Sequence, residues 1–176
     1  MKRPGDRKAV TRLAVVACLL GTPVDADVWK DYPVRDERGF VVGYGIEIAG
    51  QLADGYRPRV THLNADCVGQ RTTVRIEVRN FDFGTAPVRV RWASPGEEER
   101  AAVWDVCDDG SCIGQWGEQE GRRDEQAFAF LRRLQGAAEL RMTVEPPHAK
   151  PVSILFKLDG IGKSVWDLDR NCRRPP

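Results

Sequence analysis

Cysteines and histidines are the residues of this chain whose types and spacing could do chemistry. Besides Cys18, near the N-terminus, there are four cysteines and only two histidines, His62 and His148. There is no Cys-x-x-Cys, and neither histidine lies at ligand spacing from a cysteine, which argues against a metal site and a redox-active dithiol. We therefore expect no metal, and two structural disulfides among Cys67, Cys107, Cys112 and Cys172.

The spacing of the four cysteines favours one of their three pairings. Cys107 and Cys112 flank Asp-Asp-Gly-Ser, and Asp-Gly is strong hairpin-turn chemistry, so the two arms would bring the sulfurs together. The remaining pair is Cys67–Cys172. It closes a long loop that the chain-entropy model values at roughly 4–5 kcal/mol.

Catalytic signals are weak. There is no Gly-x-Ser-x-Gly, His-Glu-x-x-His or phosphate-binding glycine loop. His62, with Asp66 nearby in sequence, could act as a general base, but a surface or hydrogen-bonded histidine is the favoured interpretation. Asp105, Asp108 and Asp109 lack the alternating spacing of a calcium loop, and turn chemistry explains them. We predict that the protein is not an enzyme and needs no cofactor.

Tryptophans offer a second kind of site. Trp104 and Trp116 flank the cysteine hairpin, where they could present an aromatic face to a protein or a glycan. The competing interpretation is that they belong to the core or stabilise the hairpin. Both interpretations remain open from the sequence.

The N-terminal 26 residues have the pattern of a secretory signal peptide. Five basic residues precede the apolar run from Leu13 to Leu20, and Val24-Asp25-Ala26 suits a signal peptidase. Residues 27–176 would then form a single exported domain, periplasmic or secreted, where disulfides persist. Val15-Val16-Ala17-Cys18 has the form of a lipoprotein cleavage site. However, only two apolar residues, Leu13 and Ala14, come directly before it, which favours an ordinary signal peptide and argues against a lipid anchor at Cys18.

Charge and hydropathy narrow the range of partners. The whole chain has a net charge of +1, and loss of the leader, with five basic and two acidic residues, leaves −2. Such a near-neutral surface argues against nucleic acid. No stretch of the mature chain is long and apolar enough to span a membrane. We expect a protein partner in the envelope.

Alternating and helical patterns predict the elements that would position these residues. Residues 72–79 and 88–92 alternate as two strands that we expect to pair, and 140–144 and 153–158 form a second such pair. Residues 102–106 and 113–116 form the arms of the cysteine hairpin. Helical spacing covers 124–135 and about 161–171. The order predicts an α+β fold, a disulfide-stapled antiparallel sheet with two helices packed on one face.

Laid out in this way, the second half resembles VasI/TagO-like proteins, small exported accessory proteins of type VI secretion clusters. The matching features are Trp29, Cys67 with Thr72-Thr73-Val74, Val88 to Trp92, Phe130 to Leu134, Leu140 to Val144, Phe156 to Gly160 and Cys172. The resemblance implies an exported, non-enzymatic accessory domain whose first and last mature cysteines pair. The alternative is a periplasmic inhibitor or envelope-stress protein that acts through the Trp-bearing hairpin.

Overall fold

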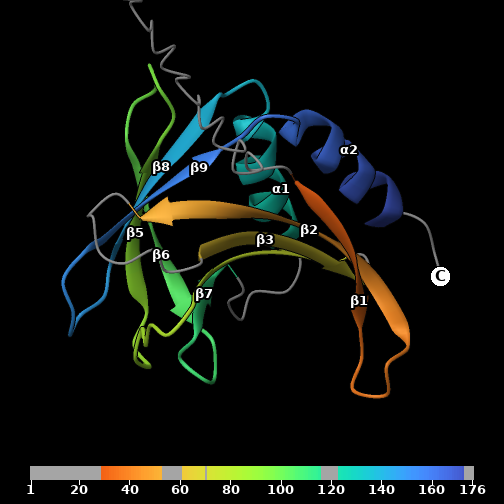
Figure 1. The fold of residues 1–176 in the computed structure, drawn as a ribbon, viewed down its shortest axis with the longest axis horizontal. Helices are drawn as coiled ribbons and strands as arrows, with labels where there is room; N and C mark the ends of the chain where they lie inside the picture. The colour runs from red at the N-terminus through yellow and green to blue at the C-terminus, as the bar shows by residue number, and fades with distance from the viewer. Residues whose placement is uncertain (1–28, 53–60, 70, 116–122, 173–176) are drawn as a thin grey trace, which may run out of the picture.

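Eight antiparallel strands close into a barrel in the computed structural model of the protein (Figure 1). Their order around the barrel is β2-β3-β4-β7-β6-β5-β8-β9, and β9 pairs back to β2. A ninth strand, β1, pairs with β2 from outside this ring. The strands are β1 (Lys30–Arg35), β2 (Val41–Leu52), β3 (Thr61–Val68), β4 (Arg71–Val78), β5 (Val88–Ala93), β6 (Arg100–Val106), β7 (Cys112–Gly114), β8 (Glu139–Glu145) and β9 (Val152–Lys157).

The structure describes residues 29–52, 61–69, 71–115 and 123–172. The predicted leader with Cys18, and the predicted contact residue Trp116, lie outside these ranges. In the described ranges, neither helix is long and apolar enough to cross a lipid bilayer.

The predicted α+β fold is wrong, because the sheet closes on itself. The strand β2 has 12 residues, and its pairing with β1 and β3 ends at Gly50, two residues before the strand does. Its last three residues, Gly50 to Leu52, pair with Phe156 to Ile154 of β9. A Cβ at Gly50 would lie 2.5 Å from the Phe156 ring, so the missing side chain leaves room for that ring where the barrel closes.

Some predicted strand pairs are confirmed and one is wrong. The strands β6 and β7 pair beside the cysteine turn, and β8 pairs with β9. The strands β4 and β5 do not pair, since β7 and β6 lie between them. The alternating pattern of both strands favoured a hairpin between them. In the sheet, however, the hairpin of β6 and β7, which follows them in the sequence, lies between β4 and β5.

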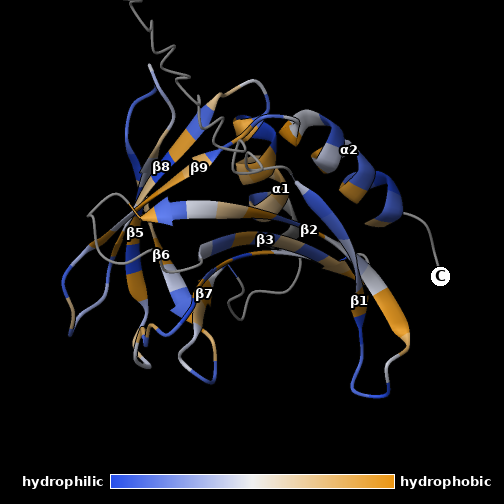
Figure 2. Ribbon diagram, in the orientation of Figure 1, coloured by the Kyte–Doolittle hydropathy of each residue, from blue (hydrophilic) through white to orange (hydrophobic). Residues whose placement is uncertain are grey.

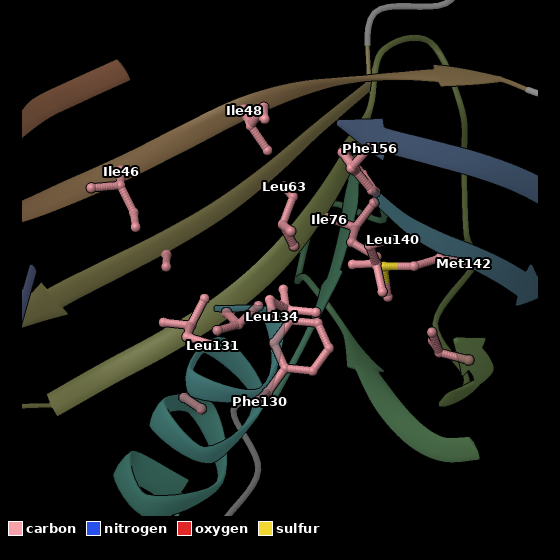
Figure 3. Close-up of a cluster of buried hydrophobic side chains, with 14 of the residues drawn as sticks. Ile46, Ile48, Leu63, Ile76, Phe130, Leu131, Leu134, Leu140, Met142 and Phe156 are labelled. Carbon is pink, nitrogen blue, oxygen red and sulfur yellow. The ribbon is translucent and has the colours of Figure 1, made fainter. Parts of the chain in front are cut away.

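Two short helices, α1 (Arg123–Leu134) and α2 (Ile161–Cys172), pack against the barrel strands, which corrects the predicted arrangement of two helices on one face of an open sheet. The helix α1 contacts β4, whereas α2 contacts β2 and β3. Figure 3 shows Phe130, Leu131 and Leu134 of α1 directed toward the apolar side chains of the strands. The labelled strand residues of this core are Ile46, Ile48, Leu63, Ile76, Leu140, Met142 and Phe156, all buried.

Alternation in β3 and β4 gives the barrel wall two different faces. Thr61, Leu63, Ala65 and Cys67 point into the core, and the alternate residues His62, Asn64 and Asp66 point outward. The same alternation in β4 directs Arg75 and Glu77 outward, beside the outward residues of β3. The hydropathy colouring shows both kinds of residue along these strands (Figure 2).

Both predicted cysteine pairs lie at disulfide distance. Cys67 of β3 and Cys172 of α2 have Cα atoms 5.5 Å apart. The Cα atoms of Cys107 and Cys112 are 5.2 Å apart across the turn between β6 and β7. These separations are compatible with two disulfide bonds, one of which ties the last helix to the barrel wall.

Candidate functional site

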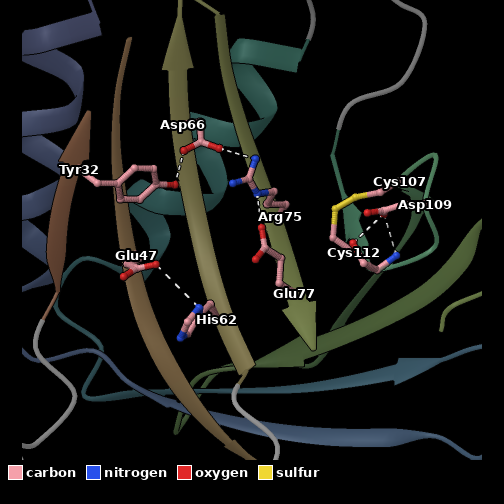
Figure 4. Close-up of polar contacts among 10 residues, drawn as sticks. Tyr32, Glu47, His62, Asp66, Arg75, Glu77, Cys107, Asp109 and Cys112 are labelled. Atoms are coloured by element: carbon pink, nitrogen blue, oxygen red, sulfur yellow. Dashed lines mark hydrogen bonds and ion pairs between the residues drawn. A yellow bond between two sulfur atoms is a disulfide. The ribbon is translucent and has the colours of Figure 1, made fainter. Parts of the chain in front are cut away.

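A chain of polar side chains crosses four strands on the outside of the barrel (Figure 4). The Tyr32 hydroxyl on β1 donates a hydrogen bond to Asp66 on β3. The other oxygen of Asp66 lies 2.8 Å from Nη1 of Arg75 on β4. Arg75 also donates through Nε to Glu77, at 2.8 Å. With the nearby pair of Glu47 and His62, these side chains form what we call the outer polar face: Tyr32, Glu47, His62, Asp66, Arg75 and Glu77.

Gly45 of β2 makes this arrangement possible. Strand β2 lies between β1 and β3, and Gly45 is opposite both Tyr32 and Asp66 in the register. A Cβ at this position would lie 2.5 Å from the Tyr32 ring and 2.6 Å from Oδ1 of Asp66. The absence of a side chain therefore lets the tyrosine ring lie across β2 and reach the carboxylate.

Gly45→Ala should lower the free energy of unfolding by about 1–3 kcal/mol, because the methyl group overlaps the Tyr32 ring. Urea denaturation of the purified protein measures this change. Gly162→Ala is the matched control, since a Cβ at Gly162 meets no atom within 4 Å and alanine favours the helix. Equal stability of both variants would contradict the role given to Gly45.

Burial sets the electrostatics of this face. The side chain of Asp66 is only 8% exposed. Desolvation raises the pKa of Asp66, although the Arg75 charge and the Tyr32 hydrogen bond act in the opposite direction. Burial would lower the pKa of Arg75, but the carboxylates of Asp66 and Glu77 outweigh it and raise this pKa. The ion pair is thus held in a partly dehydrated place, where charges are costly unless they are paired.

The tyrosine hydroxyls resist ionisation. Desolvation, and then the charge of Asp66, raise the pKa of Tyr32 above its ordinary value. Desolvation also raises the pKa of Tyr44, which hydrogen-bonds Asp31. Tyr32 therefore stays protonated and remains a donor to Asp66 through the neutral range.

Alkaline pH should destabilise the fold through these tyrosines. A group whose folded pKa is raised contributes stability below its unfolded pKa, about 10 for tyrosine, and loses it as the pH rises further. Thermal unfolding measured from pH 8 to 11 should show this loss. Tyr32→Phe should cost about 1–2 kcal/mol at neutral pH for the lost hydrogen bond, and should make the alkaline fall shallower. An unchanged alkaline slope would contradict the assignment to Tyr32.

An open pocket of about 360 Å³ adjoins the outer polar face. His62 and Glu77 belong to both, and Nδ1 of His62 lies 3.8 Å from Oε2 of Glu47. The other lining residues come from the end of β4 and from the cysteine turn. The whole lining is His62, Glu77, Val78, Arg79, Asn80 and Ser111.

The register of the strands separates the polar side chains that line this pocket. In the register, Glu77 lies between His62 and Cys112, the neighbour of Ser111. His62 and Ser111 thus stand about two strand spacings apart, roughly 10 Å, with Glu77 between them. The Ser111 hydroxyl instead donates to Asp109 at 2.7 Å. This hydrogen bond also lowers the pKa of Asp109, which fits the predicted turn role.

The structure separates Trp104 from this face. Trp104 is 0% exposed and lies in the core, where its ring meets those of Trp92 and Phe130 at centroid distances of 6.4 and 5.9 Å. Its position corresponds to the core interpretation, and no surface of Trp104 is left for a partner. In the described ranges, no group of three or more His, Cys, Asp or Glu residues is placed to hold a metal ion.

Sequence reasoning missed most of the outer polar face. It considered His62 with Asp66, but both lie on the same strand, and their contacts come from other strands: Glu47 for His62, and Tyr32 and Arg75 for Asp66. The alternation of residues 61–68 was a signal that could have revealed β3 and its outward row.

The chain matches no model of a known protein family, no curated protein and no solved structure.

Proposed function

We propose that the protein is an exported, non-enzymatic binding or accessory module of the bacterial cell envelope. In this proposal it contacts a protein partner through the outer polar face and the adjoining pocket. The leader pattern and the two cysteine pairs support export. The link to type VI secretion rests on the resemblance of residues 67–172 and is part of the proposal.

The observation that carries the binding site is the partly buried ion pair of Asp66 and Arg75 on the outer side of the wall. Asp66 and Arg75 lie away from the apolar core, yet Asp66 is almost completely covered. Even a fully buried ion pair is weak evidence for stability, and Arg75 is still 34% exposed, so stability alone is a weak reason for this pair. An ordered polar surface beside an open pocket is a better reason, because it offers fixed hydrogen-bonding groups to a partner.

A pull-down from envelope extract tests the proposal, with the mature, oxidised protein as bait. Arg79→Glu reverses a charge at the pocket, and Lys150→Glu makes the same change at an exposed turn between β8 and β9. We expect one reproducible partner with the wild type and with Lys150→Glu, and its loss with Arg79→Glu. A partner encoded by a type VI cluster would support the pathway. Equal capture by both variants, or no partner for a folded bait, would contradict the proposed site.

The inhibitor alternative has less support than the accessory module. It would act through the hairpin that bears Trp104 and Trp116; Trp104 is fully buried, and Trp116 lies outside the described residues. The accessory-module proposal does not need Trp104, because the outer polar face (Figure 4) and the lining of the pocket do not include it.

A further inference from the structure

The two cysteine pairs are nested in the sequence. Cys107 and Cys112 both lie between Cys67 and Cys172, so the long pair encloses the short pair of the turn between β6 and β7. A chain that emerges N-terminus first exposes both turn cysteines before Cys172. Two wrong partners are therefore available to Cys67 before the right one appears.

A bond between Cys67 and either turn cysteine is incompatible with the barrel. In the register of β4, Cys67 lies opposite Thr72 and Cys112 lies opposite Glu77. These two positions are five residues apart along β4, which corresponds to about 17 Å. The Cα atoms of a disulfide lie within about 7 Å of each other. Cys107 is 5.2 Å from Cys112 and is thus out of reach of Cys67 as well.

Loop length favours the wrong bonds of Cys67 as long as all four thiols are free. The probability that a flexible loop closes falls with about the −3/2 power of its length. Cys67 is about 40 residues from Cys107 and 105 from Cys172, so in an unfolded chain it meets Cys107 about four times as often. Cys112 competes to nearly the same extent. Pairing by chance would therefore give mostly wrong bonds.

The turn cysteines have a much shorter loop between them. They are only 5 residues apart, so their loop closes about 20 times as often as the loop from Cys67 to Cys107. Once Cys107 and Cys112 are joined, the mature chain has no free cysteine but Cys67 and Cys172. The first bond thus decides the second.

Hydrogen bonds within the turn bring its two cysteines together without help from the barrel. The Cys107 N–H donates to the Cys112 carbonyl at 2.8 Å, and the Gly110 N–H donates to the Cys107 carbonyl at 2.9 Å. The Ser111 N–H donates to the Asp109 carboxylate at 3.0 Å (Figure 4). All of these groups belong to residues 107–112, so the turn can form as soon as this segment is available.

The long pair, in contrast, depends on the whole fold. Cys172 ends the last helix, α2, which reaches Cys67 only by packing against β2 and β3. Both cysteines are buried there, with exposed fractions of 3% and 6%. Their bond is therefore expected to form late, after the turn has closed.

We propose that the Cys107–Cys112 bond forms before the barrel and prevents wrong pairing, because it leaves Cys172 as the sole partner of Cys67. For each bond, one thiolate of the chain attacks the disulfide of a donor, which forms a mixed disulfide and releases one donor thiolate. The second thiolate of the chain displaces the other donor thiolate. The donor gains the two electrons and takes up the two protons.

The partner that this order requires is a disulfide donor, and no disulfide isomerase is needed. The inference rests on the proposed export, which places the chain in an oxidising compartment and removes Cys18. It does not depend on the outer polar face or on the pocket.

Oxidation of the reduced mature chain in concentrated guanidinium chloride tests the proposal, because loop length alone acts there. One equivalent of diamide joins two thiols per chain, and mass spectrometry of the alkylated peptides locates the bond. We expect Cys107–Cys112 to be more than about three quarters of the first bonds. A second equivalent should give Cys67–Cys172, and removal of the denaturant should then give the folded protein.

Two variants separate the order of pairing from the stability of the turn. Cys112→Ser leaves Cys107 free to compete, so Cys67–Cys107 should exceed Cys67–Cys172 about fourfold in denaturant. The double variant Cys107→Ser/Cys112→Ser is the matched control. It has no wrong partner left, so it should form Cys67–Cys172 and fold.

The contrary results are equally distinct. A mixture of first bonds without a preference for Cys107–Cys112, or a wild type that folds only after an isomerase is added, would overturn the proposal. A double variant that forms Cys67–Cys172 but does not fold would show that the turn bond is needed for the fold itself. Absence of the protein from the cell envelope would contradict the proposed function, whereas the pairing order in the purified chain would stand.

Discussion

Replacing Cys67 and Cys172 together by alanine should lower the free energy of unfolding by about 4–5 kcal/mol. The two cysteines are 105 residues apart in the sequence, so their bond removes much of the freedom of the unfolded chain. The loss is a large part of the 5–15 kcal/mol that stabilises an ordinary domain. Guanidinium denaturation of the oxidised proteins measures it, with the unfolding midpoint as readout.

The second cysteine pair supplies the comparison. Cys107 and Cys112 are only 5 residues apart, so the same model gives their bond about 2 kcal/mol. The double alanine variant of this pair should therefore lose about half as much stability. Free thiols in the oxidised wild type, detected by mass spectrometry, would contradict both disulfides. A larger loss from the short loop than from the long one would contradict the entropic explanation.

Trp104→Ala should destabilise the protein by about 3–5 kcal/mol, the cost of removing a large buried aromatic side chain and leaving a cavity. Trp104 is completely buried, and its ring meets Phe130 at 80° and Trp92 at 56°. Removing it takes away the ring contacts of β6 with Trp92 of β5 and with Phe130 of α1. Thermal unfolding followed by circular dichroism measures the loss.

Trp166→Ala is the control of the same residue type. Trp166 lies on α2, is 56% exposed and has the Arg170 guanidinium 5.1 Å from its ring centre. Its removal should cost no more than about 1 kcal/mol, mainly for this cation–π contact. A Trp104→Ala variant as stable as Trp166→Ala would mean that Trp104 is not in the core, and would reopen the partner-binding interpretation.

The sequence predicted local elements well, because each has its own periodicity. Both helices, the pairing of β8 with β9 and the turn between Cys107 and Cys112 follow from patterns within about 20 residues. Barrel closure could not be predicted in this way. It depends on Gly50 of β2 meeting Phe156 of β9, and both strands look amphipathic or apolar whether the sheet is open or closed.

The candidate site was less predictable than the fold. Tyr32, Asp66 and Arg75 come from three strands. Tyr32 reaches Asp66 only because Gly45, which lies between them, has no side chain. Nothing in the spacing of these residues along the chain marks them as neighbours. Their outward direction was predictable for Arg75, where residues 72–79 alternate, but not for Tyr32, whose strand has no clear alternation.

The pairing of β2 with β9 bears on the moment at which the chain can fold. A chain that emerges N-terminus first, from a ribosome or through a membrane channel, has most of the barrel strands available long before β9 appears. Until then, the edge of β2 that β9 covers stays unpaired, and another chain can join it. The protein is therefore exposed to misassembly during most of its emergence, and a chaperone that covers this edge would protect it until the last strand arrives.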